Sequence, residues 1–140
     1  MKPSGRYVLD SFALLAFLAD EPGAGTVREI LEYGQRHSGS LWISVINLGE
    51  CLYIIEREQG LPAAHRAIAA IRQLPVKEMI ADQGRTFAAA HIKANHKLSF
   101  ADAFAVALAQ EKSATVVTGD PEFSHIEPLI PVLWLPRRVR

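Results

Sequence analysis

The amino-acid sequence predicts an α/β fold with a mainly parallel central sheet. Short apolar runs of strand type alternate along the chain with longer segments whose apolar residues recur at helical spacing. Clusters of glycine, proline and small polar residues separate these segments. No repeat, linker or low-complexity tract interrupts the pattern. The length of 140 residues therefore favours a single domain over residues 1–140.

The first half of the chain predicts two strands and three helices. The first helix ends at the breaker Asp20-Glu21-Pro22-Gly23, and Ser44 is suited to be the N-cap of the third helix. The expected strands are residues 6–9 and 41–43, and the expected helices are residues 11–19, 26–36 and 45–58.

The second half predicts three more helices and three more strands. Asp82 and Ser99 are suited to cap the last two helices, and Gly119 ends the fourth strand at what we expect to be a sharp backbone turn. We expect Trp42 and Trp134, which lie in strand-like runs, to be core residues. The helices are residues 63–73, 83–96 and 100–112, and the strands are residues 76–80, 114–118 and 131–135.

Composition narrows the class of protein. Fifteen basic and fifteen acidic residues cancel, which argues against a protein that coats nucleic acid through a global positive charge. The single Cys51 has no disulfide partner in the chain and sits among apolar neighbours, as expected of a packing residue in a reducing cytoplasm. The apolar stretch at residues 12–19 resembles a signal sequence, but it has no good cleavage site and is too short to span a bilayer.

Four acidic residues occupy positions that suit a shared site. Asp10 follows the first predicted strand and Asp120 follows the fourth, so both belong at the edge where parallel α/β sheets bind ligands. Glu50 lies about two turns into the helix after the second strand, and Asp102 lies in the first turn of the helix that begins near Ser99. Strand position thus brings Asp10 and Asp120 to one edge, and the combination of all four acids suggests a shared site.

Each acid also has an ordinary explanation when taken alone. Asp10 is suited to cap the first helix, and Ser99 with Asp102 matches a capping box. Asp120 followed by proline resembles a cap with proline at the first helical position. Glu50 is explained equally well as a solvated side chain on a helix edge. The joint placement, and no single position, carries the prediction.

Four segments in order resemble the motifs of PIN-domain nucleases. They are residues 8–15 with Asp10, 44–50 with Glu50, 98–103 with Asp102, and 118–123 with Asp120 in a T-x-D-x-x-F pattern. The resemblance covers nearly the whole chain. The length of the chain and its single domain are similar to those of VapC toxins. It implies a three-layer α/β/α sandwich with a sheet of about five strands.

The same resemblance implies a metal-dependent ribonuclease. One or two Mg²⁺ or Mn²⁺ ions would relieve the repulsion among the carboxylates and activate a water molecule for phosphodiester hydrolysis. Asp10 and Asp102 would be direct ligands, with Asp120 close by. Glu50 would bind through water or help to activate the attacking water. The division of roles among the four acids follows from the resemblance alone.

Other polar residues are secondary candidates. Ser11 and Thr118 lie beside site aspartates and could orient a carboxylate, although turn or cap hydroxyls explain them as well. Basic residues that could contact RNA phosphates also have a simpler explanation as solvated surface. They are Lys93, His96, Lys97, Arg137, Arg138 and Arg140.

The resemblance further implies a homodimer and a cognate VapB-like antitoxin that covers helices of the N-terminal half. The apolar residues Leu14, Leu15, Phe17 and Leu18 nearly encircle their helix, which fits either a partner or burial under a doubly covered sheet. No membrane partner is expected. Two alternatives to a toxin stay open: a housekeeping PIN nuclease for RNA maturation or structured DNA, and a non-catalytic PIN-like binding scaffold.

Overall fold

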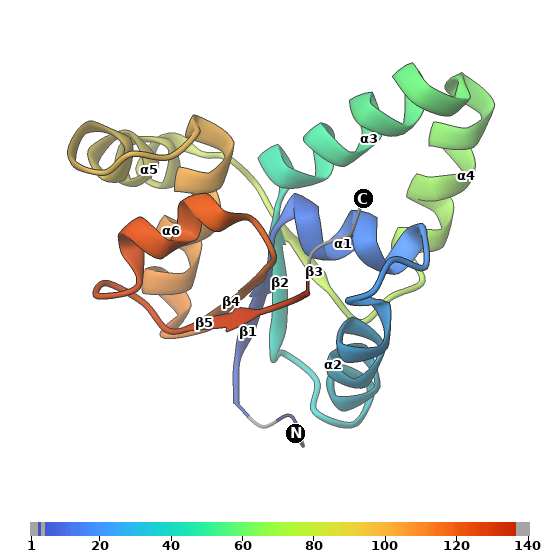
Figure 1. Ribbon diagram of the computed structural model, residues 1–140, viewed down its shortest axis with the longest axis horizontal. Helices are drawn as coiled ribbons and strands as arrows, with labels where there is room; N and C mark the ends of the chain where they lie inside the picture. The colour runs from blue at the N-terminus through green and yellow to red at the C-terminus, as the bar shows by residue number, and fades with distance from the viewer. Residues whose placement is uncertain (1–2, 4, 137–140) are drawn as a thin grey trace.

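A five-stranded sheet in which every strand pairing is parallel forms the centre of the computed structural model, which describes residues 3 and 5–136 (Figure 1). The strand order is β3-β2-β1-β4-β5, and the predicted fold class is confirmed. The strands are β1 (Tyr7–Leu9), β2 (Leu41–Ser44), β3 (Lys77–Met79), β4 (Thr115–Thr118) and β5 (Val132–Trp134).

Six α-helices and one 3₁₀ helix connect the strands within the described residues. The side chains of Ser44, Asp82 and Ser99 cap their helices as predicted. No helix in this part of the chain is long and apolar enough to cross a membrane. The helices are α1 (Ser11–Leu18), α2 (Ala24–Arg36), α3 (Val45–Gln59), α4 (Leu61–Ile71), α5 (Gln83–Asn95), α6 (Phe100–Lys112) and the 3₁₀ helix η1 (Pro121–Ile126).

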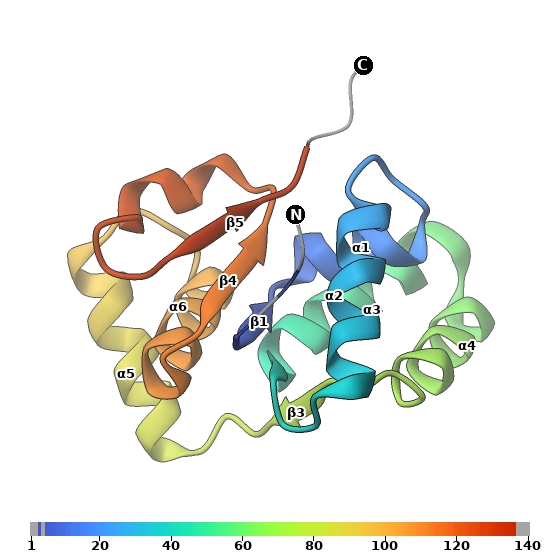
Figure 2. The ribbon, with the colours of Figure 1, turned by 90° about the horizontal axis from the view of Figure 1, so that it is seen from below.

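Helices cover both faces of the sheet, so the strands are buried on two sides. Along β1, Tyr7 and Leu9 pack with Val27 and Ile30 of α2, whereas Val8 points to the opposite face and packs with α6. This alternation follows from the two-residue period of a strand. Figure 2 shows α5 and α6 on one side of the strands and α1 and α2 on the other.

Helix α6 lies close against the sheet and is the most deeply buried helix of the described chain. Every residue from Asp102 to Ala109 is buried. Four of these are alanines, whose small side chains allow the helix to approach β1, β2 and β4 closely. The start of α6, with Asp102, is thereby held firmly at one edge of the sheet.

The prediction that Trp134 is a core residue is wrong. Trp134 ends β5, an edge strand, and its side chain is 39% exposed. Its indole N–H donates a hydrogen bond to Glu127 Oε2 at 3.3 Å. Trp42, on the inner strand β2, is buried as predicted, and the Lys112 ammonium lies 5.4 Å from the centre of its ring.

Candidate active site

Asp10 and Asp120 are brought together by strand pairing. Strands β1 and β4 are adjacent and parallel, with Leu9 opposite Val117. Asp10 directly follows β1, and Asp120 follows β4 after Gly119. Both carboxylates therefore lie at the carboxyl edge of the sheet, as predicted for a ligand site of a parallel α/β fold.

Asp10 caps α1, but the cap uses only one of its two carboxylate oxygens. Oδ1 accepts a hydrogen bond from the Ala13 backbone N–H at 2.9 Å, while Oδ2 is buried without a hydrogen-bond partner among the described residues. Burial raises the pKa of Asp10 to about 8, and the charges of Asp102 and Asp120 add to the rise, while Thr118 and the Ala13 N–H oppose it. Because Asp10 Oδ2 is a buried acceptor without a hydrogen-bond donor, a proton or a cation beside it would be favourable.

Asp102 occupies the first turn of α6 and is also buried. The Ser99 hydroxyl accepts a hydrogen bond from the Asp102 backbone N–H at 3.1 Å, so the Ser99 half of the predicted capping box forms. Burial raises the pKa of Asp102 to about 7, and the charge of Asp120, followed by those of Glu50 and Glu122, strengthens the effect against the Ser99 hydrogen bond. These interactions place the Asp102 carboxyl group between the other acids.

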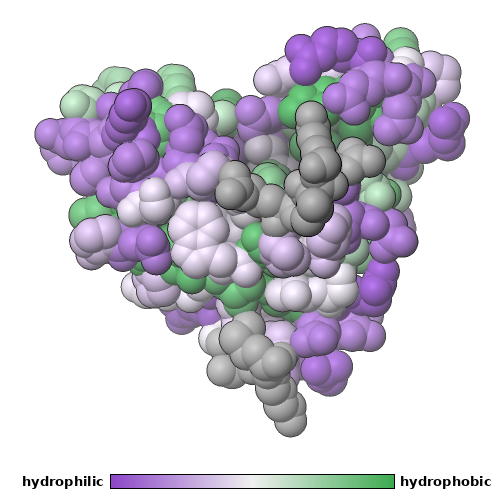
Figure 3. All heavy atoms as spheres, viewed as in Figure 1, coloured by the Kyte–Doolittle hydropathy of each residue, from purple (hydrophilic) through white to green (hydrophobic). Residues whose placement is uncertain are grey.

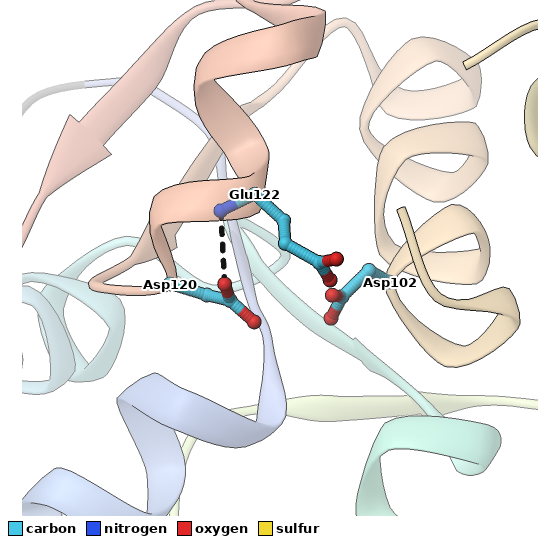
Figure 4. Close-up of side chains that lie close together, drawn as sticks. All are labelled: Asp102, Asp120 and Glu122. Carbon is cyan, nitrogen blue, oxygen red and sulfur yellow. Dashed lines mark hydrogen bonds between the residues drawn. The ribbon is translucent and has the colours of Figure 1, made fainter. Parts of the chain in front are cut away.

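Asp120 and Glu122 meet Asp102 from the opposite side. Asp120 Oδ1 accepts the Glu122 backbone N–H at 3.0 Å and caps η1, and Thr118 Oγ1 accepts the Asp120 N–H at 3.0 Å. One oxygen each of Asp102, Asp120 and Glu122 lies within 4.8 Å of the others (Figure 4). Glu122 was not predicted as a site residue, because its only signal in the sequence is its position two residues after Asp120.

Glu50 is held by the hydroxyl group of Ser11, which donates a hydrogen bond to Glu50 Oε1. The two residues come from α1 and α3, which pack together around the fully buried Cys51. The Cys51 thiol donates to the Ser11 carbonyl at 3.6 Å, so the predicted packing role of this cysteine is confirmed. Ser11 thus orients Glu50, and Thr118 supports Asp120 through its backbone.

Asn47 is a second residue near the site that was not predicted from the sequence. It is fully buried on α3, one turn before Glu50, and its amide group donates to the Ala101 carbonyl at the start of α6 at 3.1 Å. The bond ties the helix that carries Glu50 to the helix that carries Asp102. An asparagine within an apolar helix gave no signal of this contact.

The five carboxylates at this edge form no ion pair with any described basic residue, whereas Glu78, Asp82 and Glu111 do. Asp82 also caps a helix through its side chain, but Arg85 pairs with it at 3.2 Å, and Glu111 pairs with the same arginine at 3.0 Å. Unpaired oxygen donors that include the buried Asp10 Oδ2 suit Mg²⁺ or Mn²⁺, which prefer carboxylate and water ligands. The residues present therefore fit a divalent cation.

The predicted RNA-contact residues fall into two groups. Lys93 is exposed in the last turn of α5, and His96 and the exposed Lys97 lie in the connection that leads to Ser99 and Asp102. The tail residues lie outside the described chain. They are Arg137, Arg138 and Arg140.

Gly119 is required by close packing and not by an unusual backbone conformation. Its φ is not positive, so the sharp turn that we expected does not explain it. A Cβ atom at this position would lie 2.2 Å from Phe12 Cε1, because the Phe12 ring packs directly over the glycine. Asp120 directly follows Gly119 in the sequence, so this contact lies next to the site.

We expect Gly119→Ala to lower the free energy of unfolding by about 1–3 kcal/mol, because the ring or the strand end must move. Displacement of Asp120 should also weaken binding of Mn²⁺. Thermal unfolding and Mn²⁺ titration measure both effects. Gly25→Ala is the matched control: its Cβ meets nothing within 4 Å on the helix α2, so the change should leave stability equal or slightly higher.

The fold and the site together define a class of protein: a parallel α/β domain with unpaired carboxylates at the carboxyl edge of its sheet. The chain belongs to the PIN domain family, which its sequence matches over residues 7–128. A search of the curated proteins finds no match.

Solved structures share this fold. A chain of the DNA-bound VapBC2 complex from Rickettsia felis is 16% identical, with a TM-score of 0.74 over 93% of this chain and 98% of that one. DNA-bound VapBC from Salmonella typhimurium gives 18% identity, the same TM-score of 0.74 and the same coverages of 93% and 98%. VapC20 of Mycobacterium tuberculosis, described as a sarcin–ricin loop cleaving toxin, is 23% identical with a TM-score of 0.66 over 84% of this chain and 92% of that one.

Proposed function

We propose that the protein is a divalent-metal-dependent endoribonuclease and the toxin of a cytoplasmic toxin–antitoxin pair. The observation that carries the proposal is the cluster of Asp10, Glu50, Asp102 and Asp120, which the fold brings together with no basic partner among the described residues and with a buried unpaired oxygen on Asp10. Membership of the PIN domain family and the likeness to a structure described as an RNA-cleaving toxin support it.

The proposal gives each acid a role. Asp10 and Asp102, the two most buried acids, would hold Mg²⁺ or Mn²⁺, with Asp120 beside them. A bound ion would lower the pKa of a water molecule and stabilise charge on the phosphate. Glu50, held through Oε1 by Ser11, would have Oε2 free to orient a water molecule and to accept its proton. The RNA 2′-hydroxyl is not needed as a nucleophile.

RNA would approach past the connection between α5 and α6. Lys93 and Lys97 are exposed there, next to His96, and each can neutralise a phosphate. Phe100, 46% exposed and two residues before Asp102, offers a ring face on which a base can stack. The basic residues Arg137 and Arg138 would add phosphate contacts.

RNA cleavage is the direct test. Total RNA incubated with the protein should be cut at discrete sites in Mg²⁺ or Mn²⁺ and should remain intact in EDTA. Cutting of structured DNA in place of RNA would favour the housekeeping alternative. Failure to cut either nucleic acid, with no metal-induced rise in melting temperature, would favour a binding scaffold. Growth arrest on expression, relieved by a neighbouring antitoxin gene, would distinguish the toxin from a housekeeping enzyme.

An apolar groove supports the antitoxin partner. It has a volume of about 570 Å³ and lies between α1, α3 and α4. Figure 3 shows apolar surface in this part of the molecule with hydrophilic residues around it. The apolar lining includes Leu15, Leu18 and Ile54, and Arg66 and Glu58 stand among the charged lining residues. We propose that an extended segment of a VapB-like antitoxin binds here, as the VapBC complexes among the similar structures suggest.

Ile54→Arg should weaken inhibition by the antitoxin by about 30-fold or more while leaving RNA cleavage intact, because a charge replaces an apolar lining residue. Inhibition curves with increasing antitoxin measure this change. Tyr53→Arg is the control, since Tyr53 is 53% exposed on the same helix and does not line the groove. Equal loss of inhibition in both variants would mean that the antitoxin does not bind in this groove.

We also propose a homodimer. Ile80 and Phe87, which follow the edge strand β3, are 66% and 63% exposed although both are large and apolar. Such side chains are typical of protein interfaces. The mass of the protein in solution, measured by sedimentation, checks the proposal.

A further inference from the structure

We propose that Glu122 is a further ligand of the divalent cation and that it completes, with Asp102 and Asp120, a cation position on the solvent side of buried Asp10. The inference rests on the proposed metal-dependent function. It adds a fifth carboxylate to Asp10, Glu50, Asp102 and Asp120. The exposure of the acids sets the direction, because Asp10 and Asp102 are buried, Asp120 is half-buried and Glu122 is exposed.

The conformation of η1 places Glu122 at this position. Phe123 and Ile126 are fully buried and anchor the 3₁₀ helix to the core. The hydrogen bond from the Glu122 N–H to Asp120 Oδ1 fixes the turn between the two acids. Figure 4 shows the Glu122 side chain extending from η1 toward the carboxylate of Asp102. The three groups come within 4.8 Å of one another without any rearrangement of the backbone.

The direction of the Glu122 side chain is favoured by a counter-charge. Two or three carboxylates at this separation repel one another, and an exposed glutamate is free to turn into water. The described arginines and lysines do not supply the counter-charge, since they form no ion pair with this group. A divalent cation between the three oxygens would turn the repulsion into attraction.

A second observation at the same edge also points to a cation. Asp10 Oδ2 is buried and has no hydrogen-bond partner among the described residues, although Asp10 is only 1% exposed. Asp10 interacts electrostatically with both Asp102 and Asp120. A cation held by Asp102, Asp120 and Glu122 would therefore also lower the electrostatic cost of the unpaired interior oxygen of Asp10.

The position suits the proposed reaction. Mg²⁺ and Mn²⁺ take six oxygen ligands and keep several water molecules, so three carboxylate oxygens leave sites open for water and for a phosphate oxygen. An ion on the exposed side of Asp10 is accessible to an RNA phosphate. Glu122 would then strengthen metal binding at the face that the substrate contacts.

Titration with Mn²⁺, followed by loss of the EPR signal of the free ion, tests the inference on the full chain without any substrate. Glu122→Gln keeps the size of the side chain and the N–H that bonds to Asp120. We expect it to weaken Mn²⁺ binding by about ten-fold or more or to remove one bound ion. Glu29→Gln, an exposed glutamate on α2, should bind Mn²⁺ as the wild type does. Asp10→Asn should weaken binding as well.

The outcomes separate this inference from the proposed function. If the wild type binds Mn²⁺ and Glu122→Gln binds it equally well, the inference is wrong, and loss of binding in Asp10→Asn would leave the proposed metal site standing. If the wild type binds no Mn²⁺, both fail. Glu122→Lys gives an independent readout: in EDTA its melting temperature should rise, because an ammonium replaces a repelling carboxylate, and added Mn²⁺ should no longer raise it. A melting temperature in EDTA at or below that of the wild type would contradict the inference.

Discussion

Asp10→Asn and Asp102→Asn are each expected to slow RNA cleavage by about 100-fold or more, because loss of a direct metal ligand should cost at least as much as loss of an outer partner. The asparagine amide has nearly the size of the carboxyl group. Its oxygen can still accept the Ala13 N–H at position 10, so α1 should keep its cap. The rate of cleavage of a labelled RNA at saturating Mg²⁺ measures the effect.

Asp82→Asn is the matched control for this pair. Asp82 caps α5 as Asp10 caps α1, with Oδ1 accepting a backbone N–H at 2.9 Å in both cases. The difference is that Asp82 is paired with Arg85 and lies outside the cluster. Asp82→Asn should cleave RNA at the wild-type rate. Full activity in both Asp10→Asn and Asp102→Asn, or cleavage that survives EDTA, would refute the metal-carboxylate mechanism.

Without metal, the folded protein is expected to lose stability as the pH rises. Burial lifts the pKa of Asp10 from its ordinary value of 3.8 to about 8 and that of Asp102 to about 7. At a pH between the ordinary pKa and the raised pKa, these carboxyl groups are protonated in the folded protein but ionised in the unfolded chain. The free energy of unfolding therefore falls with rising pH from about pH 4 to pH 8. Thermal unfolding in EDTA at a series of pH values measures the trend.

Two comparisons test the cause of this trend. Asp10→Asn should raise the melting temperature in EDTA at pH 8, by about 4 °C for each kcal/mol gained, because it removes the group that must be protonated or charged in the interior. Mg²⁺ should stabilise the wild type most at high pH, where protons no longer compete for the carboxylates. A wild type whose stability in EDTA is constant or rising between pH 5 and pH 8 would contradict the assignment.

Most of the fold could be predicted from local sequence signals. Ser44, Asp82 and Ser99 mark helix starts because a side-chain oxygen that accepts a backbone N–H is a local property. The exposure of Trp134 could not be predicted in the same way. It depends on β5 lying at the edge of the sheet, and strand order is set by long-range pairing that a single apolar run does not specify.

The site also contains residues that local sequence signals predict and residues that they do not. Asp10 and Asp120 could be placed at one edge because each follows a strand, and strands of a parallel sheet end together. Glu122 joins them only through the 3₁₀ turn after Asp120, and Asn47 acts only where α3 crosses the start of α6. Both contacts depend on how elements pack, which leaves no pattern in a single sequence. The roles within the cluster remain proposals that the variants above are designed to test.

The pairing of β1 with β4 also governs when the protein becomes complete during its synthesis. Asp10 is translated directly after β1, but its neighbour Asp120 follows a strand that begins at Thr115. A nascent chain that stops before β4 lacks Asp120 and leaves one side of β1 without a partner. Closing so long a loop is also slow, since contacts between distant parts of a chain form late. Asp120 can therefore join Asp10 only after β4 has been translated and has paired with β1.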